Sequence, residues 1–212
     1  MASFFPRSDM LFDGPARAKL TVALAHGAGA GMDHPFMAHI AAGLGAAGFR
    51  VARFEFPYMA ARRKDGRKRP PDRAPVLCAC IDAVVGELGA ERLVLAGKSM
   101  GGRIAADRAD ALGVRGLIAL GFPFHAPGKP VGTRADALAK MHTPTLILQG
   151  ERDPFGTAAE ISGYKLSKAV RVHTLADGDH SLKPRKASGR SEAQNLDEAV
   201  ATAAAFLKGL AP

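Results

Sequence analysis

The chain has 212 residues, of which 47% are hydrophobic, and a formal net charge of +9. This apolar content excludes intrinsic disorder, and the 24 glycines and 14 prolines show no collagen-like period. No apolar run is long enough for a membrane helix, and Met1–Asp13 lacks the features of a signal peptide. Only Cys78 and Cys80 are present, which argues against a disulfide framework or a cysteine metal site. We therefore expect one domain over residues 1–212, in a reducing cytoplasm, without membrane contact, cofactor or metal.

Short apolar runs alternate with helical patterns along the chain. The clearest helix is the stretch around Leu77–Leu88, whose apolar residues recur three, four and seven positions apart. Strands separated by helices form right-handed crossovers and a parallel sheet. The sequence predicts an α/β three-layer sandwich with a mostly parallel sheet of six to seven strands. The expected strands are Leu20–Ala25, Phe49–Phe56, Leu93–Ala96, Val114–Gly121, Thr145–Leu148 and Val170–Leu175.

Two glycine-rich stretches could be mistaken for nucleotide sites. A phosphate-binding loop ending in Gly97-Lys98-Ser99 requires a glycine where the chain has Arg92. A dinucleotide fingerprint in the turn after the first strand requires a third glycine where the chain has Met32 or His34. We therefore expect no binding of ATP or of a nicotinamide cofactor.

The stretch Gly97-Lys98-Ser99-Met100-Gly101 fits the Gly-x-Ser-x-Gly pattern of a nucleophile elbow. An elbow needs a strand directly before the serine and a helix directly after it, because the turn forces serine to a positive φ. The expected strand Leu93–Ala96 and helix Gly102–Leu112 satisfy this demand. The pattern predicts that Ser99 is a catalytic nucleophile.

A serine nucleophile needs a base and an acid, and in this architecture they follow it in the order Asp, then His. Asp153 comes just after the expected fifth strand and His180 just after the sixth, so both emerge at the same sheet edge as Ser99. His180 would take the serine proton and Asp153 would hold the imidazole tautomer. Asp177 and Asp179 compete with Asp153, but they would need a sharp turn to reach the His180 ring.

The remaining site residues are expected at the same edge of the sheet. The oxyanion donors are expected to be the N–H groups of Met100 and Ala28, with Gly29 as the alternative to Ala28. His26 is expected to brace this glycine-rich loop rather than to react. Phe124 and His125 follow the fourth strand and are candidates for substrate binding, with a purely structural loop role as the alternative for His125.

At this point the chain resembles the α/β-hydrolase superfamily over nearly its whole length. The stretches that carry the resemblance are His26-Gly-Ala-Gly-Ala-Gly-Met-Asp33, Gly97-Lys-Ser-Met-Gly-Gly-Arg103 and Gly178-Asp-His-Ser-Leu-Lys183. They are similar to a small bacterial branch related to dienelactone-hydrolase-like proteins and to the hydrolase-like domain of a non-specific-lethal chromatin-complex subunit. The resemblance implies an N-terminal hairpin that is reduced or missing, and no full lid domain within Phe122–Pro144.

Two functions follow from these residues. The first is a serine hydrolase that cleaves an ester or thioester of a small molecule, and the alternative is a non-catalytic binding or scaffold module. Two basic segments, Arg62–Arg73 and Lys183–Arg190, allow an anionic substrate if they reach the site, although solvated loops are the simpler interpretation. Nucleic acid is disfavoured as a partner because no aromatic residues are interleaved with these basic residues.

Overall fold

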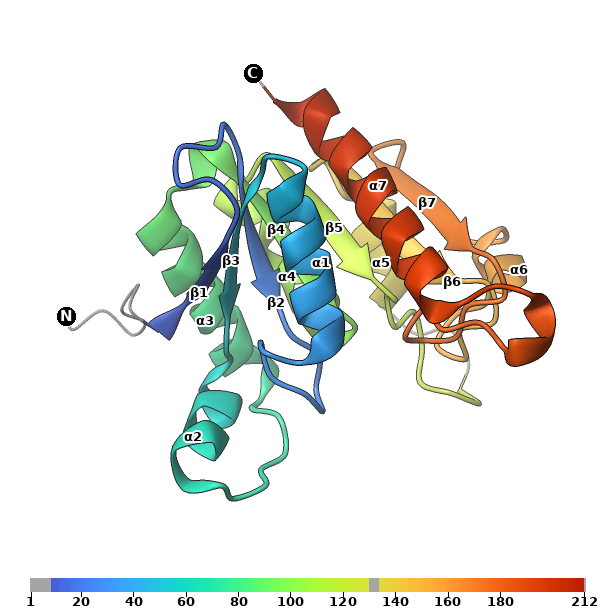
Figure 1. Ribbon diagram of the computed structural model, residues 1–212, viewed down its shortest axis with the longest axis horizontal. Coiled ribbons are helices and arrows are strands. Elements are labelled where there is room, and N and C mark those ends of the chain that lie inside the picture. Colours follow the sequence, from blue (N-terminus) through green and yellow to red (C-terminus); the bar gives the residue numbers. More distant parts are fainter. Residues whose placement is uncertain (1–8, 130–133, 212) are drawn as a thin grey trace.

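The computed structural model describes residues 9–129 and 134–211 (Figure 1). One seven-stranded sheet runs in the order β1-β3-β2-β4-β5-β6-β7. The short strand β1 is antiparallel to β3, and every other pair is parallel. The predicted mostly parallel sheet is therefore confirmed. The strands are β1 (Leu11–Asp13), β2 (Thr21–Ala25), β3 (Arg50–Phe54), β4 (Leu93–Lys98), β5 (Gly116–Leu120), β6 (Thr145–Gly150) and β7 (Val170–Leu175).

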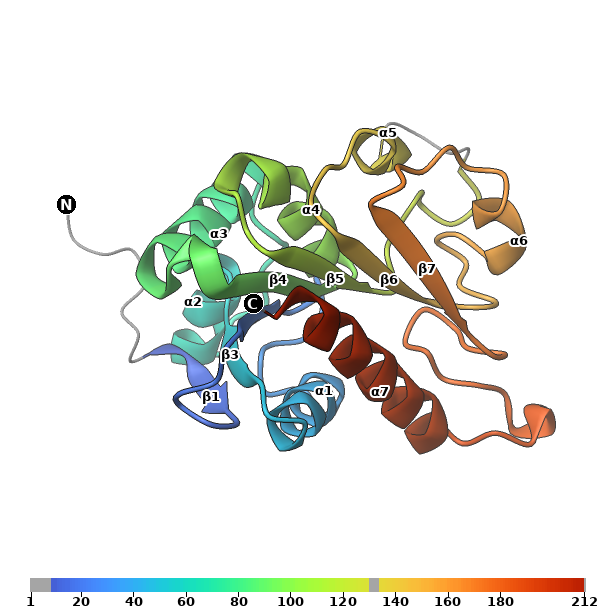
Figure 2. The same cartoon turned by 90° about the horizontal axis from the view of Figure 1, so that it is seen from above.

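Helices cover both faces of this sheet, as Figure 2 shows. One face carries α1 and α7, and the other carries α2, α3, α4 and α5. Residues of β4 alternate between the two cores: Leu93 and Leu95 pack on one side, Val94 and Ala96 on the other. The helices are α1 (Pro35–Ala46), α2 (Pro57–Asp65), α3 (Ala74–Leu88), α4 (Met100–Leu112), α5 (Arg134–Ala139), α6 (Ala158–Ile161) and α7 (Glu192–Leu210).

The N-terminal part of the fold is short. Asp13 of β1 forms an ion pair with Arg53 of β3 at 3.0 Å, which ties the antiparallel strand to the sheet edge. From Asp9 onward this is the one strand that precedes β2, in agreement with a reduced hairpin. The stretch Met1–Asp13, expected to lack a signal peptide, falls partly outside the described residues, as do residues 130–133 of Phe122–Pro144. The described part of Phe122–Pro144 holds only the six-residue helix α5.

The basic segment Arg62–Arg73 is not simply a loop, and that expectation was wrong in part. Its first residues end α2, which starts at Pro57 and stops at Gly66 with φ 71°. Proline at the first helical position and glycine just past the end are common helix signals. Within the described residues, no helix is long and apolar enough to cross a membrane.

Candidate active site

The site is built around the turn between β4 and α4. Ser99 adopts φ 50° and ψ −114°, a conformation that residues with a side chain rarely adopt. A Cβ on Gly97 would lie 2.4 Å from the Gly102 nitrogen, and one on Gly101 would lie 2.5 Å from the His26 carbonyl oxygen. Because backbone atoms cannot give way by so much, both positions require glycine. Strand β4 runs to Lys98 and helix α4 begins at Met100. Each element thus comes two residues closer to Ser99 than the sequence predicts.

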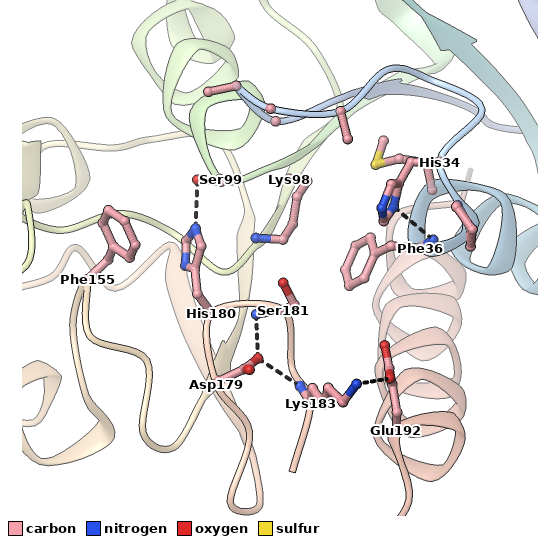
Figure 3. A pocket seen from close by; sticks show the side chains of 16 residues that line it. His34, Phe36, Lys98, Ser99, Phe155, Asp179, His180, Ser181, Lys183 and Glu192 are labelled. Carbon is pink, nitrogen blue, oxygen red and sulfur yellow. Dashed lines mark hydrogen bonds and ion pairs between the residues drawn. The ribbon is translucent and has the colours of Figure 1, made fainter. Parts of the chain in front are cut away.

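His180 and Asp153 meet Ser99 at this turn. The Ser99 Oγ lies 2.8 Å from His180 Nε2, and His180 Nδ1 lies 2.8 Å from Asp153 Oδ2 (Figure 3). A carboxylate only accepts hydrogen bonds, so Nδ1 carries the imidazole proton and Nε2 accepts the serine proton. The structure thus brings together three residues that come from the ends of β4, β6 and β7.

Asp153 is completely buried, and every oxygen of its carboxylate has a donor. Oδ1 accepts from the Phe155 N–H at 2.9 Å, and Oδ2 accepts from Gln149 Nε2 at 2.9 Å as well as from His180. The Phe155 ring also packs against the His180 ring, with centroids 4.2 Å apart. Gln149 and Phe155 therefore fix the carboxylate and the imidazole in place.

The loop after β2 faces Ser99 across the cavity. The Tyr58 hydroxyl lies 3.2 Å from the Gly27 carbonyl oxygen and 2.9 Å from the Ala28 carbonyl oxygen. In a trans peptide the N–H points away from the carbonyl, so the N–H groups of Ala28 and Gly29 point away from Tyr58. Burial raises the pKa of Tyr58 to about 12, which keeps the hydroxyl a donor at neutral pH.

His26 holds the start of the same loop. Its Nε2 accepts from the Phe56 N–H at 3.0 Å, so the proton is on Nδ1, which donates to the Gly27 carbonyl at 2.6 Å. Burial lowers the pKa of His26, in agreement with a neutral ring. Both ring nitrogens form hydrogen bonds with backbone groups, so His26 holds the start of the loop in place.

Met100 supplies another free donor beside Ser99. It is the first residue of α4, and the N–H groups of the first helical turn have no acceptor within the helix. Its N–H and the N–H of Ala28 lie on the two segments that border Ser99, the start of α4 and the loop after β2.

A model of the family described as alpha/beta hydrolase domain matches residues 18–208. The chain belongs to this family. The match spans every strand from β2 to β7 and all the residues that surround Ser99.

Solved structures of other α/β hydrolases have the same fold. A serine hydrolase without a lid from Xanthomonas campestris is 19% identical, with 91% of this chain and 88% of that chain covered and a TM-score of 0.65. An alpha-beta serine hydrolase homologue from Coxiella burnetii is 21% identical, covering 92% and 90%, with a TM-score of 0.67. A dienelactone hydrolase from Anabaena variabilis is 20% identical, covering 94% and 90%, with a TM-score of 0.68. Membership of this family supports hydrolase activity in general.

A cavity of about 600 Å³ opens at Ser99 and His180 in this α/β hydrolase. Its wall includes the loop Gly27–Ala30, the start of α1 with Phe36, and the residues that follow His180. Figure 3 shows Lys98 between Ser99 and Phe36, and Phe155 beyond His180. The cavity therefore has room for a small molecule beside Ser99.

The two residues expected to bind substrate lie elsewhere. Phe124 is fully buried and packs against Phe122, with ring centroids 4.9 Å apart. His125 is 7% exposed, and its Nε2 lies 3.5 Å from a Glu160 oxygen. Neither residue lines the cavity at Ser99, because both side chains are buried where the chain follows Gly121, which has φ 64°. Their substrate contact stays a prediction.

Sequence reasoning missed several residues of this site. Gln149, Tyr58 and Phe155 were not singled out, because an amide, a phenol or a phenyl ring has no motif of its own. The motif Gly97–Gly101 includes Lys98 but assigns it no role. Among the described residues, no group of three or more His, Cys, Asp and Glu side chains is placed to hold a metal ion.

Proposed function

We propose that this α/β hydrolase is a serine hydrolase that cleaves a carboxylic ester or thioester of a small molecule through an acyl-enzyme. The observation that carries the proposal is the continuous chain of hydrogen bonds from Ser99 through His180 to Asp153, with both links at 2.8 Å. It ends on a serine held at φ 50°. Strained residues at such positions are typical of sites where the strain serves the mechanism.

Acylation starts with the Ser99 Oγ attacking the carbonyl carbon of the substrate. As the new C–O bond forms, the serine proton passes to His180 Nε2. The Asp153 carboxylate, hydrogen-bonded to Nδ1, stabilises the resulting imidazolium. The buried donors on Asp153 keep this carboxylate from rotating away from the ring.

The negative charge that develops on the carbonyl oxygen needs donors that are already in place. We assign this role to the N–H groups of Met100 and Ala28, with Gly29 as the alternative to Ala28. Tyr58 and His26 orient the second loop by binding its carbonyl groups. These two residues are positioning residues, since they do not contact the reacting atoms.

Collapse of the tetrahedral intermediate breaks the bond to the leaving group. His180 gives its proton to the departing alkoxide or thiolate, and the acyl group stays on Ser99. A water molecule then attacks the acyl carbon while His180 Nε2 takes its proton. Release of the carboxylic acid returns the proton to Ser99.

Hydrolysis of p-nitrophenyl butyrate and of butyryl thiocholine tests the proposal. Ser99→Ala and His180→Ala should each lower kcat by at least about 10³-fold, and Asp153→Asn by about 10³-fold or more, because the wrong imidazole tautomer is then favoured. His142→Ala is the matched control, since that side chain is 90% exposed and lies outside the cavity.

Two outcomes would contradict the proposal. Turnover that survives His180→Ala would show that another group is the base. A folded wild-type protein that cleaves neither ester nor thioester would instead favour a binding or scaffold module.

A further inference from the structure

Lys98 has an unusual position for a cation. It is the last residue of β4, directly before Ser99, and its side chain points into the cavity rather than into solvent (Figure 3). Over residues 9–129 and 134–211, no carboxylate or other acceptor lies within bonding distance of its ammonium group. The centroid of the Phe36 ring lies 5.8 Å from Nζ.

The other charged groups of the cavity are already occupied. Lys183 pairs with Glu192 at 3.2 Å. Asp179 Oδ1 accepts from the N–H groups of Ser181 and Lys183, at 2.7 and 3.0 Å. A partly desolvated charge without a partner is unfavourable unless something compensates it. Lys98 is therefore the charged group in this cavity that can form an ion pair with a ligand.

The Lys98 side chain runs alongside the reacting groups. A Cβ on Gly27 would lie 3.5 Å from Lys98 Cγ and 3.7 Å from Ser99 Cβ. A Cβ on Gly121 would lie 3.3 Å from Lys98 Nζ and 3.4 Å from His180 Nδ1. The ammonium thus lies close to the imidazole, and a positive charge there disfavours the imidazolium that forms during catalysis. An anion bound to Lys98 removes this penalty.

We propose that Lys98 is a substrate-binding residue that pairs with a carboxylate of the ester or thioester, so that the substrate is a monoanion. This inference rests on the proposed hydrolase function. A single ammonium suits one carboxylate, whereas a phosphate dianion usually takes several donors or a bidentate arginine. The Asp179 and Glu192 carboxylates in the same wall also disfavour a dianion.

The basic segment Arg62–Arg73 does not provide this recognition. In Arg62–Arg73, Arg63 pairs with Glu55 and Asp33, and Arg69 pairs with Asp65. No residue of that segment lines the cavity at Ser99. The charge that an anionic substrate meets close to the reacting carbonyl therefore comes from Lys98.

The pH dependence follows from the surroundings of Lys98. Desolvation lowers its pKa to about 8, against the opposing attraction of Asp153 and Asp179. The ammonium is charged below this pH and neutral above it, so preference for an anionic ester should fall as the pH rises through about 8. The titratable and charged groups that face Lys98 in and behind the cavity are His34, Asp153, Asp179, His180, Lys183 and Glu192.

Three esters and three proteins test the proposal. Two of the esters are p-nitrophenyl hexanoate, which is neutral, and mono-p-nitrophenyl adipate, which carries a carboxylate at the far end of a similar acyl chain. 4-Carboxyphenyl hexanoate places the carboxylate on the alcohol side. The proteins are the wild type, Lys98→Met, which keeps the length of the apolar stem, and Lys64→Met, which removes an equal charge from an exposed surface position.

We expect the wild type to prefer one of the two anionic esters by about tenfold or more in kcat/KM, mainly through KM. Lys98→Met should abolish this preference and raise kcat/KM for the neutral hexanoate, because it removes the positive charge beside the imidazolium. Lys64→Met should keep the preference. Raising the salt from about 0.01 to 0.15 M should reduce it only slightly, because partly buried pairs are weakly screened.

A preference that persists in Lys98→Met, or its absence in the wild type for both anionic esters, would overturn the inference. An equal loss for neutral and anionic esters in Lys98→Met would also overturn it, since Lys98 would then act in the chemistry. Calorimetry with adipic acid monoanilide on Ser99→Ala needs no turnover, and Lys98→Met added to that background should weaken binding about tenfold. Loss of neutral hexanoate hydrolysis in Ser99→Ala would support the hydrolase proposal even if the inference about Lys98 fails.

Discussion

The turn after β4 and the loop after β7 each bring one side chain to the cavity, but they are held by different means. In the turn, the restraints on Ser99 come from Gly97 and Gly101, which lie two residues away on either side. In the His180 loop, here residues 176–185, the restraints come from distant parts of the chain. Gly150 lies so close that a Cβ there would be 2.1 Å from the Asp179 carbonyl oxygen.

Side chains add to the restraint of the His180 loop. Asn195 of α7 donates to the carbonyl groups of Ala176 and Leu182, at 3.1 and 2.8 Å. Glu151 accepts from the Asp177 N–H at 2.6 Å. In the described part of the chain, Ser99, Asp177 and Leu182 are the non-glycine residues with positive φ, so strain occurs in both regions. The nucleophile is thus placed by two glycines of its own motif, Gly97 packed within the turn and Gly101 against the end of β2, and the base by contacts distributed over the fold.

The largest expected effect is that of Gly101→Ala, which tests the steric restraint on the turn at Ser99. The new methyl group would overlap two backbone carbonyl oxygens, at 2.5 and 2.7 Å, and we expect a loss of about 3 kcal/mol or more in unfolding free energy. Urea denaturation measures this loss. Gly86→Ala is the matched control: its Cβ meets nothing within 4 Å in α3, so it should be neutral or stabilising. A fully stable Gly101→Ala would refute the steric account of the turn.

Gly150→Ala tests the distributed restraint. A methyl group at this position has to push the backbone of the His180 loop away, since the Gly178 carbonyl oxygen is also only 2.5 Å from it. We expect kcat to fall about 10²-fold, because a displacement of about 1 Å of a catalytic group is enough for such a loss. Circular dichroism should show that the protein remains folded. Unchanged kcat with Gly150→Ala would mean that the His180 loop is not held by β6.

These two substitutions also explain how far the sequence could predict the structure. The turn at Ser99 was predictable because the glycines that it requires lie inside one short motif, although the backbone that Gly101 approaches belongs to Ala25 and His26. The burial of Phe124 and His125 and the contacts of Gln149 and Tyr58 could not be predicted, because they depend on chain segments far away in the sequence. The sheet was predicted almost completely, whereas the three-residue strand β1 is too short for a visible alternation.

Tyr58→Phe extends the comparison to the loop after β2, which is also held by a distant side chain. Loss of the hydroxyl removes the donor to the Gly27 and Ala28 carbonyl groups. We expect kcat to fall about tenfold with KM nearly unchanged, since the loop would contact the substrate oxygen mainly in the transition state. Tyr164→Phe is the control, because none of the described residues forms a hydrogen bond with the buried Tyr164 hydroxyl. A rise in KM alone would contradict the assigned positioning role.

Asp177→Asn is expected to have the smallest effect. Hydrogen bonds from the Arg185 side chain lower the pKa of Asp177 to about 2, and asparagine tolerates its positive φ. We expect kcat to fall only about threefold, because the backbone of the His180 loop keeps its other restraints. The stability that the ionised carboxylate adds is present above its unfolded pKa of about 4 and is lost as the pH falls through about 2. The difference in Tm between Asp177→Asn and wild type should therefore be constant from about pH 8 to 5 and shrink at lower pH. A difference that grows on acidification would contradict this assignment.

The most direct test of the central proposal is labelling with a fluorophosphonate, followed by mapping of the adduct by mass spectrometry. The reagent phosphonylates a serine only when that serine is activated as a nucleophile. We expect a single adduct on Ser99 in the wild type and in Gly86→Ala, strongly slowed labelling in His180→Ala, and none in Ser99→Ala. An adduct on a different residue, or labelling that persists unchanged in Ser99→Ala, would contradict the assignment of Ser99 as the nucleophile.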